Sequence, residues 1–234
     1  VASGLWVVTT VYAVGYMRGH HEENQTRFFT FFNFAIFAAM GAALAGNLFT
    51  LFLFYEILTL STFPLVTHHG TEEARNAGRI YLGILISTSI CFLLFAIVWT
   101  WNLAGTLDFR PGGILAGTAD DFSLVVLFGL FAFGTGKAAL MPFHRWLPAA
   151  MVAPTPVSAL LHAVAVVKAG VFTILKVSIY ILGLPTLMTA ASWVVYPAAF
   201  TIVVASLVAM FKDNLKARLA YSTISQLSYI VLGA

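Results

Sequence analysis

Charged residues are scarce in this sequence. Only 9% of its 234 residues are Asp, Glu, Lys or Arg, whereas 60% are hydrophobic and the mean hydropathy is +0.93. Soluble domains carry about 25% charged residues, so this chain has too few charges to cover a surface that faces water. The chain is therefore predicted to lie in a lipid bilayer. The same scarcity excludes a disordered chain and a nucleic-acid binder built on basic patches.

Cysteine and the usual catalytic motifs are also missing or rare. The single cysteine, Cys91, excludes a disulfide scaffold. There is no pair of histidines or cysteines at metal-ligand spacing, no glycine-rich phosphate loop and no Ser/His/Asp set. We therefore expect no metal site and no bound cofactor. A membrane enzyme with its own quinone or lipid chemistry remains a rival hypothesis that no residue pattern supports.

Long apolar runs are what the sequence does contain. A helix needs roughly 20 apolar residues to cross the hydrocarbon, and the chain has about eight such segments separated by polar residues, glycine or proline. This pattern predicts an all-α, polytopic membrane helix bundle forming one transmembrane domain over residues 1–234. The spans are expected near 1–17, 28–46, 47–66, 79–103, 122–141, 155–182, 188–211 and 215–234.

Basic residues indicate the orientation of these spans. If the spans alternate in direction, Arg110 lies alone on one face and the other basic loop residues share the opposite face, which the positive-inside tendency makes cytoplasmic. The basic face holds Arg18, Arg27, Arg75, Arg79, Arg145, Lys212, Lys216 and Arg218. We expect an integral, multi-pass protein of a bacterial plasma membrane. Because the sequence starts inside an apolar stretch without methionine, we also expect it to be a fragment of a longer chain.

Ionisable residues within the spans are the candidates for function. Glu56 lies in the middle of its span, Lys137 lies in the run FGLFAFGTGKAALMP, and His162 and Lys168 share a third span. Such residues cost at least about 2.5–3.5 kcal/mol at the bilayer centre, so they normally face a protein interior and have partners. Lys176 is nearer a helix end and is expected to extend to the interface.

Each candidate also has a purely structural interpretation. Glu56 and Lys137 can form an ion pair that locks two helices, although buried pairs contribute little to stability. His162 can be a hydrogen-bonding residue between packed helices.

Glycine and proline surround Lys137. The sequence GTG precedes it, and Pro142, Pro148, Pro154 and Pro156 follow it. Because these residues weaken or remove helix hydrogen bonds, the span is predicted to be broken at or just after Lys137, as at transporter ion sites. The alternative is a simple loop between two helices.

The last span carries a polar stripe. Ser222, Ser225, Gln226 and Tyr229 recur at helical spacing, and Lys216 lies near the start of the span. Helix packing is the first explanation of the stripe, and a second proton path through Lys216, Ser222 and Gln226 is the other.

Three segments together resemble a known family. They are LFLFYEILTLSTFPLV at 51–66, GKAALMPFHRWLPAAMVAPTPVSALLHAVAVVKAGVF at 136–172 and LKARLAYSTISQLSYIVLGA at 215–234. These segments are similar to the antiporter-like membrane subunits of Mrp-type Na⁺/H⁺ antiporters, respiratory complex I and membrane-bound hydrogenases. The resemblance implies two inverted five-helix repeats, each with a broken helix. Residues 28–182 would form the first repeat, and residues 188–234 the incomplete start of the second.

The resemblance also implies roles for the buried residues. It places the family's proton- or ion-translocating groups at Glu56, Lys137, His162 and Lys168, with Lys216 as a further base. The 136–172 segment looks most like the D-type subunits of Mrp antiporters, which exchange Na⁺ for protons. A proton-pumping subunit of NADH:quinone oxidoreductase or of a membrane-bound hydrogenase is the alternative, and a non-conducting scaffold subunit is a further one. Each of these functions implies other membrane subunits as partners, and no nucleic acid.

Overall fold

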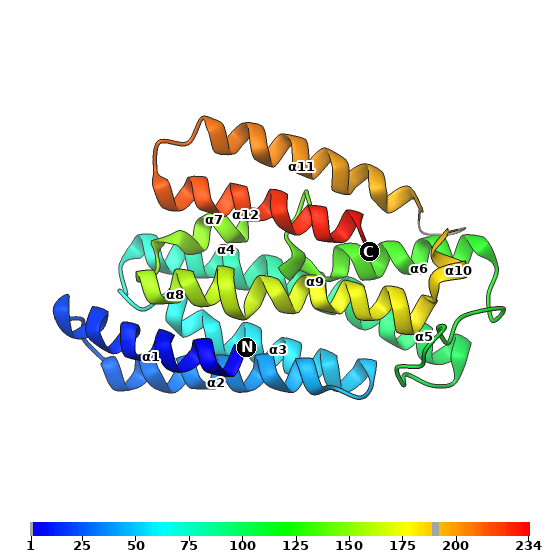
Figure 1. Cartoon of the computed structure of the whole chain (residues 1–234), viewed down its shortest axis with the longest axis horizontal. Coiled ribbons are helices and arrows are strands. Elements are labelled where there is room, and N and C mark those ends of the chain that lie inside the picture. The colour runs from blue at the N-terminus through cyan, green and yellow to red at the C-terminus, as the bar shows by residue number, and fades with distance from the viewer. Residues whose placement is uncertain (1, 189–191) are drawn as a thin grey trace.

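The computed structural model describes residues 2–188 and 192–234, and these form a bundle of helices (Figure 1). In chain order the α-helices are α1 (Ala2–Gly19), α2 (Gln25–Leu44), α3 (Leu48–Val66), α4 (Glu72–Thr88), α5 (Phe95–Ala104), α6 (Asp121–Gly134), α7 (Trp146–Ala149), α8 (Thr155–Ala159), α9 (Val166–Lys176), α10 (Leu184–Thr186), α11 (Val195–Met210) and α12 (Leu215–Leu232). The all-α bundle predicted from the apolar runs is therefore confirmed.

Two of the long helical segments contain π-helical turns. The turn Ser89–Leu94 joins α4 to α5 in a segment that runs from Glu72 to Ala104, and the turn Leu160–Val164 joins α8 to α9. A π-turn widens a helix by one residue and often occurs at functional sites.

Among the residues that the structure describes, five helical segments are long and apolar enough to cross a membrane. They are Gln25–Leu44, Leu48–Val66, Glu72–Ala104, Thr155–Leu182 and Ser192–Met210. The span predicted at 122–141 corresponds to the shorter apolar helix α6. This helix ends at Gly134, and the rest of the predicted span is not α-helical. The outer two predicted spans, at 1–17 and 215–234, form α1 and α12, which are not among these five by length and composition.

Polar residues set where several helices begin. In four of the described helices the side chain at the N-cap accepts a hydrogen bond from the backbone N–H three residues later. This bond satisfies a donor that the helix leaves free. These N-caps are Asn47 of α3, Thr71 of α4, Asp120 of α6 and Asn214 of α12. The fourth span was predicted to begin near residue 79, but its helix begins at Glu72 because Thr71 caps it there.

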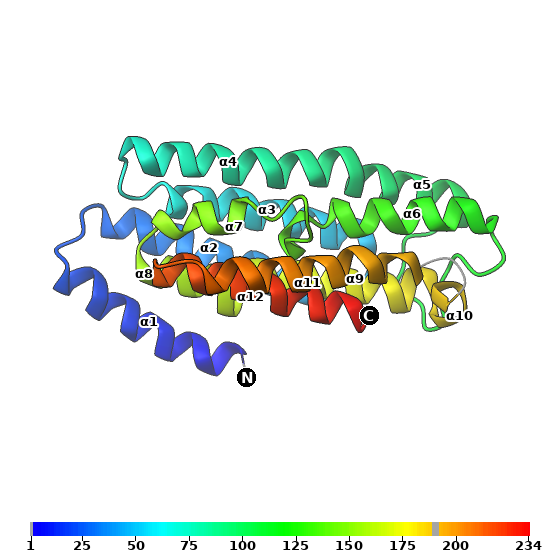
Figure 2. The ribbon, with the colours of Figure 1, turned by 90° about the horizontal axis from the view of Figure 1, so that it is seen from above.

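The helices pack as neighbouring hairpins around one core. α2 packs along α3 and α11 along α12, whereas α1 diverges from the bundle toward its N-terminus (Figure 2). α6 and α7 lie nearly end to end, with a segment that is not α-helical between them at the middle of the bundle (Figure 2). This segment contains Lys137.

The loops gather at two opposite ends of the bundle. The α1–α2, α3–α4 and α11–α12 connections lie together at one end, which we call the basic end, and the long α5–α6 connection lies at the other (Figure 1). The basic end carries Arg18, Arg75 and Lys212, as the alternation of spans predicted.

A small charged cluster joins two loops at the basic end. The Glu22 carboxylate lies 3.7 Å from Nε2 of His68 and 3.7 Å from Nδ1 of His69. Burial lowers the pKa of His68, and the Glu22 carboxylate opposes this shift. The neutral imidazole of His68 is therefore favoured at neutral pH, and the contact with Glu22 strengthens when the loop is acidified.

The orientation is testable by cysteine labelling. Glu73 and Ala116 are exposed near opposite ends of the bundle, so Glu73→Cys and Ala116→Cys, each in a Cys91→Ala background, should react from opposite sides of the membrane. The excess of basic residues predicts that Glu73→Cys reacts from the cytoplasm. Gly113 lies in the same α5–α6 connection as Ala116 but is unsuitable for a cysteine, because a Cβ there would overlap the Leu182 carbonyl oxygen. Reaction of both cysteines from one side would contradict the assignment of spans.

Candidate functional site

The helix that carries Lys137 is broken in the interior of the bundle. α6 ends at Gly134, and a fully buried 3₁₀ turn, Gly136–Ala138, follows. The end of α6 and the turn both lie directly against the α4–α5 segment. A Cβ on Gly134 would lie 2.5 Å from the backbone nitrogen of Leu93, and a Cβ on Gly136 would overlap Oγ1 of Thr88. The predicted interruption is confirmed. Residues 134–140 are buried, so the alternative of a simple loop between two helices does not describe this point of the chain.

Side chains from other helices satisfy backbone groups that the break leaves free. The backbone N–H of Lys137 donates to the Tyr55 hydroxyl over 3.1 Å, and the indole N–H of Trp146 donates to the Gly136 carbonyl over 2.9 Å. Non-helical backbone is tolerated at membrane depth only where such partners exist. Tyr55 on α3 and Trp146 on α7 therefore fix the position of the turn.

Neutral groups hold the side chain of Lys137. The residue is 0% exposed, and its Nζ donates to the Tyr55 carbonyl over 2.8 Å and to the Thr59 hydroxyl over 2.6 Å. Nζ also lies 3.1 Å from the centroid of the Tyr55 ring, a cation–π contact. Three neutral groups on α3 thus surround the ammonium.

Glu56 lies next to this arrangement but not in it. Its carboxylate has no oxygen within 4.0 Å of Nζ of Lys137, so the two residues form no ion pair in the structure. The Oε1 atom of Glu56 is buried and accepts no hydrogen bond. The interpretation as a locking ion pair is therefore wrong for this conformation. Glu56 is nevertheless close enough to Lys137 for an electrostatic interaction between the two side chains.

His162 and Lys168 lie apart from Lys137. In the π-turn Leu160–Val164, the two ring nitrogens of His162 lie 3.1 Å from Oγ1 of Thr223 on α12 and 3.3 Å from the sulfur of Met151. Lys168, on α9, is exposed. The structure therefore places no direct contact between either residue and Lys137, and a relay among the three requires water, as expected from their separation on different helices.

The polar stripe of α12 is divided between two environments. Ser225 is buried and its hydroxyl lies 2.9 Å from that of Ser206 on α11, whereas Ser222 and Gln226 are exposed. Lys216 donates to the Ala153 carbonyl over 3.0 Å. Ser225 thus packs helices together, and Lys216 binds the loop before α8.

Lys176 reaches the end of the bundle that is opposite the basic end. Its Nζ donates over 2.8 Å to the carbonyl of Ala45, the residue that follows α2, and it lies 4.3 Å from the centroid of the Phe109 ring. Like Lys216, it satisfies a carbonyl that a helix or loop leaves free.

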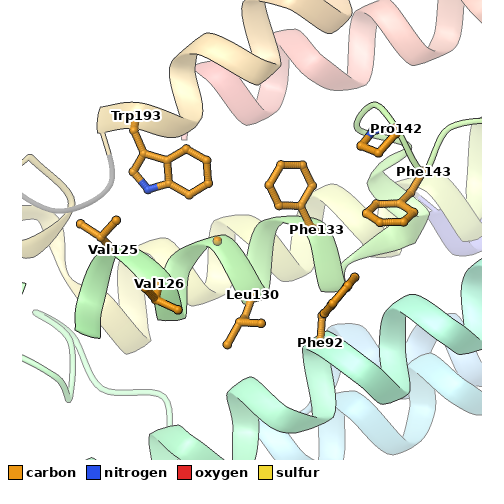
Figure 3. A pocket seen from close by; sticks show the side chains of 9 residues that line it. Phe92, Val125, Val126, Leu130, Phe133, Pro142, Phe143 and Trp193 are labelled. Carbon is orange, nitrogen blue, oxygen red and sulfur yellow. The ribbon is translucent and has the colours of Figure 1, made fainter. Parts of the chain in front are cut away.

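An apolar cavity of about 560 Å³ lies beside the break. Figure 3 shows the rings of Phe133, Phe143 and Trp193 around it, with α6 along one side. The remaining lining residues are Phe92, Val125, Val126, Gly129, Leu130 and Pro142. Because this lining is apolar, the cavity keeps polar groups away from that side of α6 and offers no bases or acids for chemistry.

The direct partners of Lys137 were not predicted from the sequence. Tyr55, Thr59 and Thr62 lie at helical spacing on α3, so their polar groups share one face that was identifiable in the run YEILTLST. Thr62 extends the set, because its hydroxyl lies 2.6 Å from that of Tyr81, whose ring contacts Trp146 edge-on. No pattern within α6 or α7 alone shows that Trp146 contacts the break.

The chain is similar to membrane subunits of known respiratory and antiporter complexes. Residues 45–234 match the family described as NADH:quinone oxidoreductase/Mrp antiporter, transmembrane region. The chain is 34% identical over 236 residues to NADH-quinone oxidoreductase subunit L of Escherichia coli K12, covering 99% of this chain and 38% of that protein. It is 30% identical to the chloroplastic NAD(P)H-quinone oxidoreductase subunit 5 of Brachypodium distachyon, covering 97% of this chain and 31% of that one.

Two solved structures have a similar arrangement of helices. A chain of the Mrp complex from Dietzia sp. DQ12-45-1b is similar with a TM-score of 0.78 and 33% identity, over 88% of this chain and 22% of that one. A chain of the archaeal membrane-bound sulfane sulfur reductase, a respiratory membrane complex, is similar with a TM-score of 0.75 and 29% identity, over 86% and 42%. The chain thus spans less than half the length of each of these relatives.

Proposed function

Because this chain belongs to the NADH:quinone oxidoreductase/Mrp antiporter family of membrane proteins, we propose that it moves protons across the membrane through Lys137, as one subunit of a multisubunit complex. The observation that carries this proposal is the environment of Lys137. The lysine is fully buried on a broken helix, where an ionisable group is costly unless it serves a function. Relatives that are subunits of membrane complexes support the role of partner subunits.

The mechanism proposed here uses Glu56 to control the charge of Lys137. A buried ammonium loses hydration, and a carboxylate at short distance compensates for that loss. If the distance between Glu56 and Lys137 changes, Lys137 gains or releases a proton. Water then carries the proton toward His162 and Lys168, because neither residue contacts Lys137 directly.

The role of Lys137 is tested by removing its amine. Lys137→Met keeps a long apolar side chain, and we expect it to abolish proton movement in membrane vesicles that contain the assembled complex. Lys212→Met is the matched control, because Lys212 is exposed at the basic end, and it should transport as the wild type does. Normal transport by an assembled Lys137→Met complex would reject the proposed function.

Two driving forces fit this role. As the D-type member of an Mrp antiporter, the protein would exchange Na⁺ for protons, and the similarity to a chain of the Mrp complex supports this role. The names of the curated relatives instead favour a subunit of a quinone oxidoreductase, in which electron transfer drives the pump. A Na⁺ gradient and an electron donor, applied separately to the same vesicles, distinguish the two: only the true driving force should move protons.

A further inference from the structure

Neutral groups bind the ammonium of Lys137, although the carboxylate of Glu56 is nearby and has a buried oxygen without a hydrogen-bond partner. The ammonium donates to the Tyr55 carbonyl and to the Thr59 hydroxyl, whereas Oε1 of Glu56 accepts nothing. Attraction between opposite charges in a poorly hydrated interior favours direct contact between Lys137 and Glu56. Some interaction must therefore hold the lysine in the position observed.

We propose that Thr59 is a positioning residue that holds Lys137 away from Glu56, so that the ammonium has two positions. One is the neutral position seen here, formed by Thr59 and Tyr55, and the other is at the Glu56 carboxylate. The inference rests on the proposed function, and it names the residue that sets the balance between the two positions.

Thr59 is suited to this role by its place on α3. It follows Tyr55 by four residues, so its hydroxyl lies one helical turn from the Tyr55 carbonyl and donates to it over 3.2 Å. With its own proton committed to that carbonyl, the hydroxyl oxygen presents a lone pair to Lys137, at 2.6 Å. Hydrogen bonds to a charged group are the stronger kind, so this contact stabilises the protonated lysine.

Tyr55 cannot set the balance by itself. Its carbonyl belongs to the backbone and its hydroxyl accepts from the backbone of the Lys137 turn, so these groups stay in place wherever the side chain of Lys137 moves. Thr59, in contrast, supplies a hydrogen bond from its side chain to the ammonium. This bond breaks when the ammonium moves toward Glu56.

The other titratable groups near Lys137 are few. Tyr55 and Glu56 lie on α3 and Tyr81 lies on α4, while His162 faces Thr223 and Met151. On α9, Lys168 is exposed and Lys176 binds Ala45 at the end opposite the basic end. Glu56 is therefore the charged group that competes with the neutral position.

The test is the pH profile of transport in Thr59→Val, which keeps the shape of the side chain but removes the hydroxyl. Removing an acceptor withdraws stabilisation from protonated Lys137, so the pH of half-maximal transport should move toward acid by about one unit, the size expected for a hydrogen bond to a charged group. Thr59→Ser restores the hydroxyl and should restore the wild-type profile. Thr100→Val is the matched control, because the buried Thr100 hydroxyl donates to the Ala96 carbonyl of its own helix, away from Lys137.

The outcomes separate this inference from the proposed function. If Lys137→Met abolishes transport but the assembled Thr59→Val complex keeps the wild-type profile, Thr59 does not position Lys137 and the inference is rejected alone. If Lys137→Met itself transports normally, the proposed function is rejected. An equal shift in Thr59→Val and Thr100→Val also rejects the inference, because it would reflect general loosening of the bundle.

Discussion

The double variant Glu56→Gln/Lys137→Met is expected to assemble at the wild-type level and to move no protons. Each single variant should give the same result. A locking ion pair behaves differently, because loss of one partner costs about 3–5 kcal/mol and loss of both is often neutral. The structure shows no ion pair between the two residues, so we expect little change in assembly when either charge is removed.

The measurement compares transport with the amount of assembled complex for both single variants, the double variant and the wild type. Glu73→Gln serves as the control for Glu56→Gln, because Glu73 is exposed in the first turn of α4. Normal transport by the double variant would show that Glu56 and Lys137 are dispensable, and it would support the scaffold alternative.

Gly170→Ala should disrupt the site from the opposite side. A Cβ at Gly170 would lie 2.4 Å from the backbone nitrogen of Ala138 and 2.5 Å from the carbonyl carbon of Lys137. Both neighbours are backbone atoms, so the turn itself has to shift. Overpacking of this kind costs about 1–3 kcal/mol, and displacement of Lys137 from Tyr55 and Thr59 should remove most of the transport.

Helix propensity by itself gives the opposite expectation for this substitution. Alanine is about 1 kcal/mol more favourable than glycine inside a helix, so an unhindered site should gain stability. Gly83→Ala on α4 provides that control, because nothing lies within 4 Å of its added Cβ. Thermal unfolding should therefore occur at a lower temperature in Gly170→Ala and at an equal or higher one in Gly83→Ala, which should also keep its transport. A Gly170→Ala protein as stable and active as Gly83→Ala would contradict the close contact between α9 and the turn.

Much of the fold follows from the sequence because its signals are local. Apolar runs of membrane-spanning length predict the helices. The N-caps Asn47, Thr71, Asp120 and Asn214 are local signals as well, although the fourth span was predicted to begin near residue 79 and the cap at Thr71 starts it at Glu72. The glycines and prolines near Lys137 predict the break for the same reason, since they act on the hydrogen bonds of their own helix. Burial of Lys137 could also be predicted, because its neighbours in the chain are apolar.

The partners of Lys137 depended on the tertiary structure. Which neutral groups receive its ammonium is decided by the approach of α3 to the turn, across 78 residues of sequence for Thr59 and 82 for Tyr55. The sequence identified Glu56 by its charge, whereas the packing aligned Thr59 with the ammonium and left Glu56 beside it. Likewise, helical periodicity placed Ser222 and Ser225 in one stripe, and only the position of α11 buried one of them. Charge and periodicity are properties of a single segment, whereas a hydrogen-bond partner depends on two segments in contact. The sequence therefore located the candidate site, and the tertiary structure determined its contacts.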